Sequence, residues 1–127
     1  MGLSDAKVGP AIAVSDLQRA KDFYEGKLGL SGGRDVEDGG YTYPCGAGTQ
    51  LHIFVSSGGA GGSESTVAGF DVADIEATVD ELSGNGVTFE QYDDPIKTDE
   101  RGIATLGGGK GAWLKDSDGN ILAIFQE

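Results

Sequence analysis

The chain has 127 residues, of which 38 % are hydrophobic, enough for one compact domain with a buried core. Its 21 acidic residues against 9 basic ones give a formal net charge of −12, which disfavours nucleic acid and anionic membranes as partners and favours cationic ligands. No apolar run approaches the ~18 residues of a membrane span. The single Cys45 can form no internal disulfide, so we expect a soluble, cytoplasmic protein.

The first half of the chain predicts a strand, a helix and three further strands. A strand is expected over 8–14, and Asp16 then stands where a helix N-cap belongs. Behind it, apolar residues recur at helical spacing until Gly29, where the helix is expected to end. These residues are Leu17, Ala20, Phe23, Tyr24 and Leu28. Strand-like runs separated by glycine follow at about 30–36, 40–45 and 49–56.

The second half repeats this order. A strand is expected over 66–72, followed by an N-cap at Asp74, and the helix behind it is expected to end near Gly84 or Gly86. Its apolar stripe is Ile75, Val79 and Leu82. Strand-like runs follow at about 87–92, 102–106, 111–114 and 121–126. We therefore predict an α+β domain spanning 1–127, with one module at about 6–56, a glycine-rich linker at 57–65 and a second module at about 66–127.

Strand alternation predicts which side chains face the helices. In the closing strands, Leu51, Ile53 and Val55, and by the repeat Leu122 and Ile124, are expected on the helix side. In the opening strands, the same side takes Ile12, Val14, Phe70 and Val72. The opposite face then carries mostly small or mixed residues, including Gly9, Ala11, Ala13, Gly69 and Ala123. Such a face leaves room for a ligand.

Two stretches of the sequence resemble the vicinal oxygen chelate superfamily, which includes glyoxalase I, extradiol dioxygenases, fosfomycin-resistance enzymes and bleomycin-binding proteins. The first covers 13–30 (AVSDL, AKDFY and KLGL), and the second covers 112–122 (AWLKDSDGNIL). The resemblance implies a pair of βαβββ modules whose mixed sheets curl around a shared cleft, with the helices on the outer face. It also implies a homodimer, since the cleft in this superfamily is often completed by a second chain.

Metal-dependent members of that superfamily supply ligands from four cleft positions, usually occupied by His, Glu or Gln. The resemblance places Gly9, His52, Val67 and Ala123 at these positions. Only one of the four side chains can bind a metal, whereas a catalytic metal needs about three protein ligands. We therefore expect no metal and no other cofactor, which argues against the activities of the superfamily that rely on one.

His52, the only histidine, is the candidate for a catalytic or ligand-contacting group, because imidazole can act as a base or a hydrogen-bonding group near neutral pH. Asp71, Tyr41 or Tyr43 are candidate partners. A cleft histidine without catalytic duty is the plainer interpretation, and no catalytic residue is assigned.

Aromatic residues can form a wall for a planar or cationic ligand by stacking or cation–π contact. The candidates are Phe54, Tyr41, Tyr43, Tyr92 and Trp113. Aromatic residues on strands are also typical of an ordinary core, and both interpretations remain open at this stage. Arg101, in a loop expected at the cleft mouth, is a candidate for pairing with an anionic ligand. Cys45 has no basic neighbour in the sequence, so we expect an unreactive thiol.

Two functions remain. The first is a metal-independent binding protein for a small organic molecule, similar to the superfamily members that sequester a cationic antibiotic. The second is a glyoxalase-like lyase or isomerase, or a dioxygenase-related enzyme, that uses His52 with tyrosine or carboxylate partners. Charge and the missing metal ligands favour the first.

Overall fold

The computed structural model describes residues 2–37, 39–56 and 58–127, and it contains two modules of the same order, β-α-β-β-β. The first module consists of β1 (Ala11–Val14), α1 (Leu17–Gly26), β2 (Arg34–Val36), β3 (Gly40–Pro44) and β4 (Gln50–Val55). The second consists of β5 (Thr66–Asp71), α2 (Ile75–Gly84), β6 (Ile103–Leu106), β7 (Gly109–Lys115) and β8 (Ile121–Gln126). The predicted α+β fold of two βαβββ modules is confirmed.

The two sheets have the same topology. The strand order is β1-β4-β3-β2 in the first and β5-β8-β7-β6 in the second, so each opening strand runs parallel to the closing strand of its own module. Ala11 lies opposite His52 in the first sheet, and Gly69 lies opposite Ala123 in the second. The sheets remain open, with β2 and β6 at one edge and β1 and β5 at the other.

Both helices begin where the sequence predicts. The carboxylate of Asp16 accepts the backbone N–H of Arg19 at 3.1 Å, and that of Asp74 accepts the N–H of Ala77 at the same distance. Each cap satisfies a donor that the first helical turn leaves unpaired. The predicted apolar stripes face the core: Ala20 and Tyr24 on α1, and Ile75, Val79 and Leu82 on α2, are buried. Past the end of α2, Gly86 adopts a positive φ of 96°, as expected for a helix-ending glycine.

One predicted strand is wrong. Residues 87–92 do not form a strand, and only Phe89 makes an isolated bridge, to Leu114. The reason is competition for the edge of β7, where β6 already pairs with the residues from Gly109 to Ala112. The opening strand of the first module is also shorter than expected, because regular pairing begins at Ala11 rather than at residue 8.

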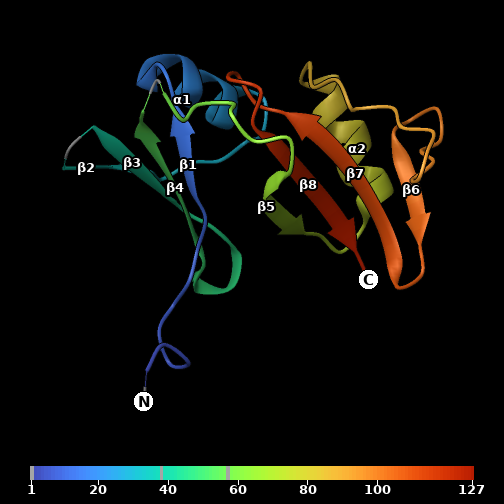
Figure 1. The fold of residues 1–127 in the computed structure, drawn as a ribbon, viewed down its shortest axis with the longest axis horizontal. Coiled ribbons are helices and arrows are strands. Elements are labelled where there is room, and N and C mark those ends of the chain that lie inside the picture. Colours follow the sequence, from blue (N-terminus) through green and yellow to red (C-terminus); the bar gives the residue numbers. More distant parts are fainter. Residues whose placement is uncertain (1, 38, 57) are drawn as a thin grey trace.

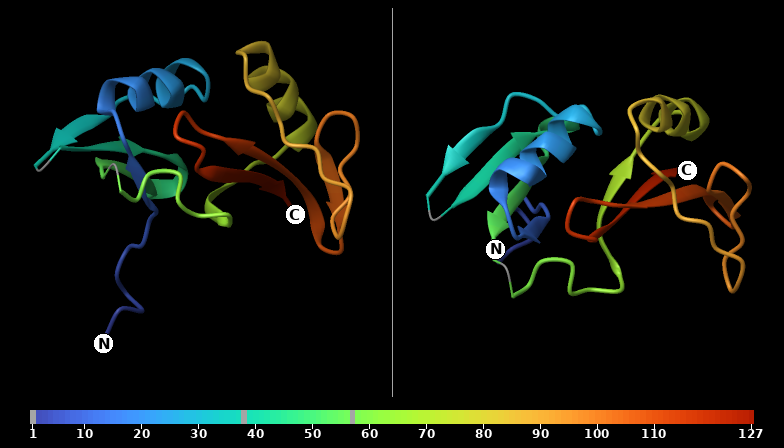
Figure 2. Two further views of the ribbon diagram at one scale, coloured as in Figure 1. Left: turned by 45° about the horizontal axis from the view of Figure 1, so that its top comes forward. Right: turned by 90° about the horizontal axis from the view of Figure 1, so that it is seen from above.

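The helix-facing residues of both modules form a single buried cluster that includes Ile12, Ile53, Leu122 and Ile124. Val55, expected on this face, is 45 % exposed at the end of β4. Both helices lie along one side of the molecule, and the segment before β1 extends away from its body (Figure 1, Figure 2). No helix in the described part of the chain combines the length and apolar character needed to cross a membrane.

The turn between β7 and β8 joins the two modules. Its Asp118 accepts hydrogen bonds from the backbone and hydroxyl of Ser15 and pairs with Arg19 at 2.8 Å. Its Asn120 donates to the carbonyl oxygen of Ala13 at 2.8 Å and accepts the N–H of Gly61 at 3.0 Å. The turn that carries much of the family resemblance is therefore a structural connection between modules.

Candidate functional site

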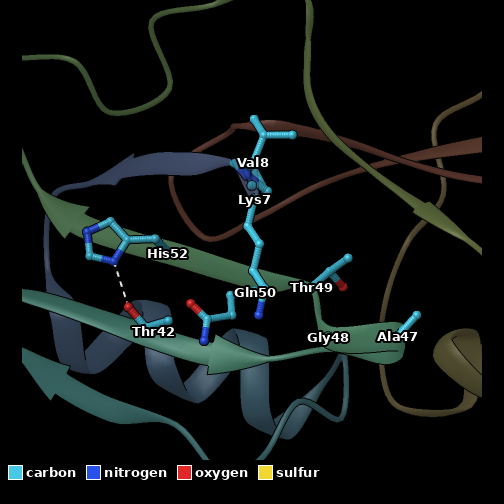
Figure 3. Close-up of a pocket in the computed structure, with 10 residues that line it drawn as sticks. Lys7, Val8, Thr42, Ala47, Gly48, Thr49, Gln50 and His52 are labelled. Atoms are coloured by element: carbon cyan, nitrogen blue, oxygen red, sulfur yellow. Dashed lines mark hydrogen bonds between the residues drawn. The ribbon is translucent and has the colours of Figure 1, made fainter. Parts of the chain in front are cut away.

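A hollow of about 520 Å³ lies on the face of the first sheet that points away from α1. Its walls come from β3, β4, the short turn at Gly46–Gly48, and the segment leading into β1 (Figure 3). The polar side chains around it are Lys7, Thr42, Thr49, Gln50 and His52. Val8 and Pro10 add apolar surface from the N-terminal segment. A hollow of this size falls within the range of small-molecule sites.

His52 is held in one orientation by its neighbours on β3. Thr42 lies directly opposite it in the strand register, and the threonine Oγ1 is 2.8 Å from His52 Nδ1 (Figure 3). A Cβ atom at Gly40 would come within 2.9 Å of the imidazole Cε1, so the glycine leaves the ring the space it occupies. Phe54 stacks beside the ring, with centroids 6.2 Å apart. The imidazole is therefore positioned by β-sheet geometry, with no acidic partner in these contacts.

The chemistry around His52 suits recognition by hydrogen bonds. Among the described residues lining the hollow, no carboxylate, tyrosine or thiol accompanies the imidazole. Asp71, one expected partner, belongs to β5 in the other sheet and lines a different hollow, at the seam between the modules. The partner of His52 is instead Thr42, a residue that sequence reasoning missed. The sequence signal for Thr42 was its position between Tyr41 and Tyr43, because alternation along a strand places it on the opposite face from both tyrosines.

Tyr41 and Tyr43 lie on the opposite face of the sheet from His52. In the register of β3 and β4 they stand opposite Ile53 and Leu51, which face the helix. Tyr43 is fully buried, and its hydroxyl donates to Glu25 on α1 at 2.8 Å. Burial raises the pKa of Tyr43 well above its usual value, and the bond to Glu25 adds to this. Of the two interpretations left open for the aromatic residues, core packing describes Tyr41 and Tyr43, because alternation along β3 places them on the helix-facing side.

Trp113 lies on β7 of the second sheet, and Tyr92 contacts it from the segment between α2 and β6. Their ring centroids are 5.7 Å apart in an edge-to-face arrangement. They line a hollow of about 260 Å³ that shares no lining residue with the one at His52. The predicted aromatic wall is therefore divided into two separate surfaces, Phe54 with His52 and Trp113 with Tyr92.

Arg101 is engaged with α2. Its guanidinium contacts Asp80 at 2.6 Å, the Glu76 carboxylate at 3.1 Å and the Glu76 carbonyl oxygen at 2.8 Å. The bond to Asp80 is the main reason why the pKa of Arg101 lies above its usual value. In this structure Arg101 therefore pairs with carboxylates of α2, and a role in binding an anionic ligand stays a prediction.

Cys45 is a half-buried free thiol. Burial raises its pKa, which keeps it in the weakly nucleophilic thiol form at neutral pH.

The side chains at the four family metal positions do not form a donor set for a divalent ion. Gly9 offers no side chain, and a Cβ there would come within 2.6 Å of the Gln50 carbonyl oxygen. Val67 sits where the pairing of β5 with β8 shifts register, and it packs against the core. Ala123 offers no ligand opposite Gly69. The described residues contain no group of three or more His, Cys, Asp or Glu side chains that could hold a metal.

Residues 8–124 match the family model of the Glyoxalase/Bleomycin resistance protein/Dioxygenase superfamily, and the chain belongs to this superfamily. No curated protein sequence matches the chain significantly.

Solved structures share its fold. The chain is similar to TnmS3, an antibiotic binding protein from Streptomyces sp. CB03234, with a TM-score of 0.68, 24 % identity and coverage of 99 % of this chain and 98 % of that one. It is also similar to the bleomycin resistance determinant encoded on transposon Tn5, with a TM-score of 0.72, 22 % identity and coverage of 95 % and 97 %. A glyoxalase/bleomycin resistance protein, also from Streptomyces sp. CB03234, gives a TM-score of 0.66, 23 % identity and coverage of 95 % and 100 %.

Proposed function

We propose that the protein binds a small organic molecule without a metal or other cofactor and sequesters it, an antibiotic or metabolite being the class of ligand. The observation that carries this proposal is the hollow around His52, which offers space for a ligand and several hydrogen-bonding groups. Of the four family metal positions, only the one at His52 has a side chain that can bind a metal. The names of two structural neighbours, an antibiotic binding protein and a bleomycin resistance determinant, support the same class of ligand.

His52, Thr42 and Gln50 are the groups we assign to ligand recognition in this hollow, with Phe54 stacked beside the imidazole. Thr42 occupies Nδ1, which leaves Nε2 as the imidazole's second hydrogen-bonding position. Val8 and Pro10 supply the apolar contact that small-molecule sites usually combine with a few polar groups.

The alternative is a glyoxalase-like lyase or isomerase in which His52 acts as a base. The observation in its favour is the fixed orientation of the imidazole by Thr42 at 2.8 Å. Proton-transfer enzymes commonly need a second group to orient or complement the base. No carboxylate or tyrosine among the described lining residues fills that role, which is why binding ranks first.

A second copy of the chain is the partner we propose for completing the site. Leu3 and Val8 in the N-terminal segment are 87 % and 90 % exposed, and Val8 borders both the His52 hollow and the hollow at the seam between modules. A homodimer would cover this apolar surface, and light scattering at micromolar concentrations tests it: a monomer mass throughout contradicts the proposal.

We further infer a single functional domain over 1–127 acting in the cytoplasm, where an unpaired cysteine is stable.

The binding proposal is tested by a thermal-shift screen that starts with cationic antibiotics, followed by calorimetry on the hits. A ligand at about 100 times its dissociation constant should stabilise the protein by roughly 2.7 kcal/mol. His52→Phe should weaken binding, because it retains a ring but loses both nitrogens. Tyr41→Phe is the matched control on the opposite face of the sheet and should leave binding unchanged.

Mass spectrometry of the recovered ligand separates the two functions. Sequestration returns the ligand chemically unchanged after long incubation with the protein. Conversion that depends on His52 would overturn the binding proposal in favour of the enzyme.

A further inference from the structure

The hollow at Trp113 has no part in the site described above. It lies between β7, the loop from Tyr92 to Thr98 and the start of β5, and it encloses about 260 Å³. At about 30 Å³ per water molecule in the liquid, this is room for a small organic group. Its aromatic walls are Trp113 and Tyr92, and Pro95, Ile96 and Ile121 add further apolar surface.

The sheet leaves the Trp113 ring accessible. Trp113 lies opposite Ala123 on β8, and Ala123 lies opposite Gly69 on β5, so the row across the sheet next to the indole contains only small residues. The small neighbours cannot cover the ring. Trp113 is accordingly only partly buried, although its neighbours Ala112 and Leu114 along the strand are buried in the core.

The loop that carries Tyr92 is fastened at both ends. The Glu90 N–H donates to the Trp113 carbonyl oxygen at 2.8 Å, which ties the loop to β7. Thr98, buried at the other end, accepts the Tyr92 N–H at 2.8 Å, and its own N–H donates to the Tyr92 carbonyl at 3.0 Å. The edge-to-face pair of rings is therefore pre-organised. Burial raises the pKa of Tyr92, with a further contribution from Glu90, so the phenol stays neutral at neutral pH.

The charged side chains that line the hollow beside the two rings are acidic. Glu64 and Asp94 line the hollow, and none of its described lining residues is basic. The net charge of −12 adds a long-range field that concentrates cations near the surface. Aromatic faces flanked by carboxylates attract organic ammonium groups through cation–π and Coulomb interactions together, whereas a neutral ligand of the same shape gains neither.

We propose that the corner formed by Trp113, Tyr92, Glu64 and Asp94 is a binding site for an alkylated ammonium group, separate from the hollow at His52. The proposal does not depend on what binds at His52.

Trp113 is the only tryptophan, so its fluorescence reports directly on this corner. The experiment titrates the intact protein with choline and, in parallel, with 3,3-dimethylbutan-1-ol, which has the same shape without the charge. Sodium chloride at equal ionic strength is the blank. We expect a saturable change with choline and an affinity at least about fivefold higher than for the neutral alcohol, the scale expected of one or two cation–π contacts.

Variants locate the site. Tyr92→Leu should weaken choline binding about threefold or more, and Tyr92→Phe, which keeps the ring, should not. Glu64→Gln should weaken it as well, whereas Glu37→Gln removes the same charge from an exposed residue beside the first sheet and should have little effect. These substitutions are at exposed positions, so the fold should survive them.

Three results would overturn the proposal. One is a choline response no larger than the sodium chloride blank. Another is equal affinity for choline and the neutral alcohol. The third is equal weakening by Glu37→Gln and Glu64→Gln, which would assign the effect to net charge alone. His52→Phe should leave choline binding unchanged, because His52 lines the other hollow. The choline site can therefore be disproved while the proposed function at His52 stands, and the proposed function can be disproved while the choline site stands.

Discussion

The hydroxyl of Tyr24 on α1 donates a 2.6 Å hydrogen bond to Asp116, which lies 92 positions further along the chain in the other module. Both side chains are buried, and the remaining acceptor positions of Asp116 take the backbone N–H groups of Asp118 and Asn120 and the Asn120 side-chain amide. Burial raises the pKa of Tyr24, and the Asp116 charge and hydrogen bond raise it further, so the phenol remains a donor across the accessible pH range.

Tyr24→Phe should destabilise the protein by about 1.5–3 kcal/mol, because one oxygen of a buried carboxylate loses its hydroxyl donor. Urea unfolding measures the loss. Tyr41→Phe makes the same chemical change at a partly buried tyrosine on the helix-facing side of β3 and should cost much less. Equal losses of unfolding free energy in the two variants would show that the hydrogen bond to Asp116 does not stabilise the protein.

The connection made by Asp118 should weaken in acid. Burial alone would raise the pKa of Asp118, but hydrogen bonds from Ser15 and the charge of Arg19 outweigh it and hold the pKa below its usual value of 3.8. Since the folded-state pKa is the lower one, the carboxylate's contribution is complete above about pH 4 and is lost as the pH falls through the folded-state value. The stability difference between the wild type and Asp118→Asn should therefore shrink between pH 6 and pH 3. A constant difference would contradict this account.

His52→Ala should leave the fold intact. The imidazole lines an open hollow on the side of the sheet away from the helix, and its hydrogen bond to Thr42 can be replaced by water entering the hollow. Thermal unfolding should show a midpoint within a few degrees of the wild type. A fall of more than about 8 °C, on the order of 2 kcal/mol for a domain of this size, would assign His52 a structural role.

Arg101→Ala should not change ligand binding at the His52 hollow, because its guanidinium contacts Glu76 and Asp80 on α2. Calorimetry with any ligand found by the thermal-shift screen checks this. A marked loss of affinity would mean that Arg101 leaves α2 when the ligand binds.

Protein purified without chelators or metal-affinity columns should contain well below about a tenth of a metal ion per chain, since a stable site needs about three protein ligands. Elemental analysis measures this directly. Near-stoichiometric zinc, iron, nickel or manganese would reveal a site built from residues other than the four family positions.

The sequence alone was sufficient for both helices and for the order of the strands, apart from the strand predicted at 87–92. Asp16 and Asp74 correctly predicted where the two helices begin, because capping is a local interaction between a side chain and the next turn of backbone. Leu51 and Ile53 were correctly placed towards the helix because side chains on a strand alternate.

Only the tertiary structure decided which residues share a site. His52 is paired with Thr42 rather than with Asp71 or a tyrosine, because the register between β3 and β4 is set by packing of whole strands. Residues 87–92 failed to form a strand because β6, later in the chain, occupies most of the edge they would use. The Arg101 guanidinium pairs with carboxylates of α2 that lie more than twenty positions away in the sequence. Each outcome depends on competition between segments distant in the sequence, which local propensity and periodicity do not contain.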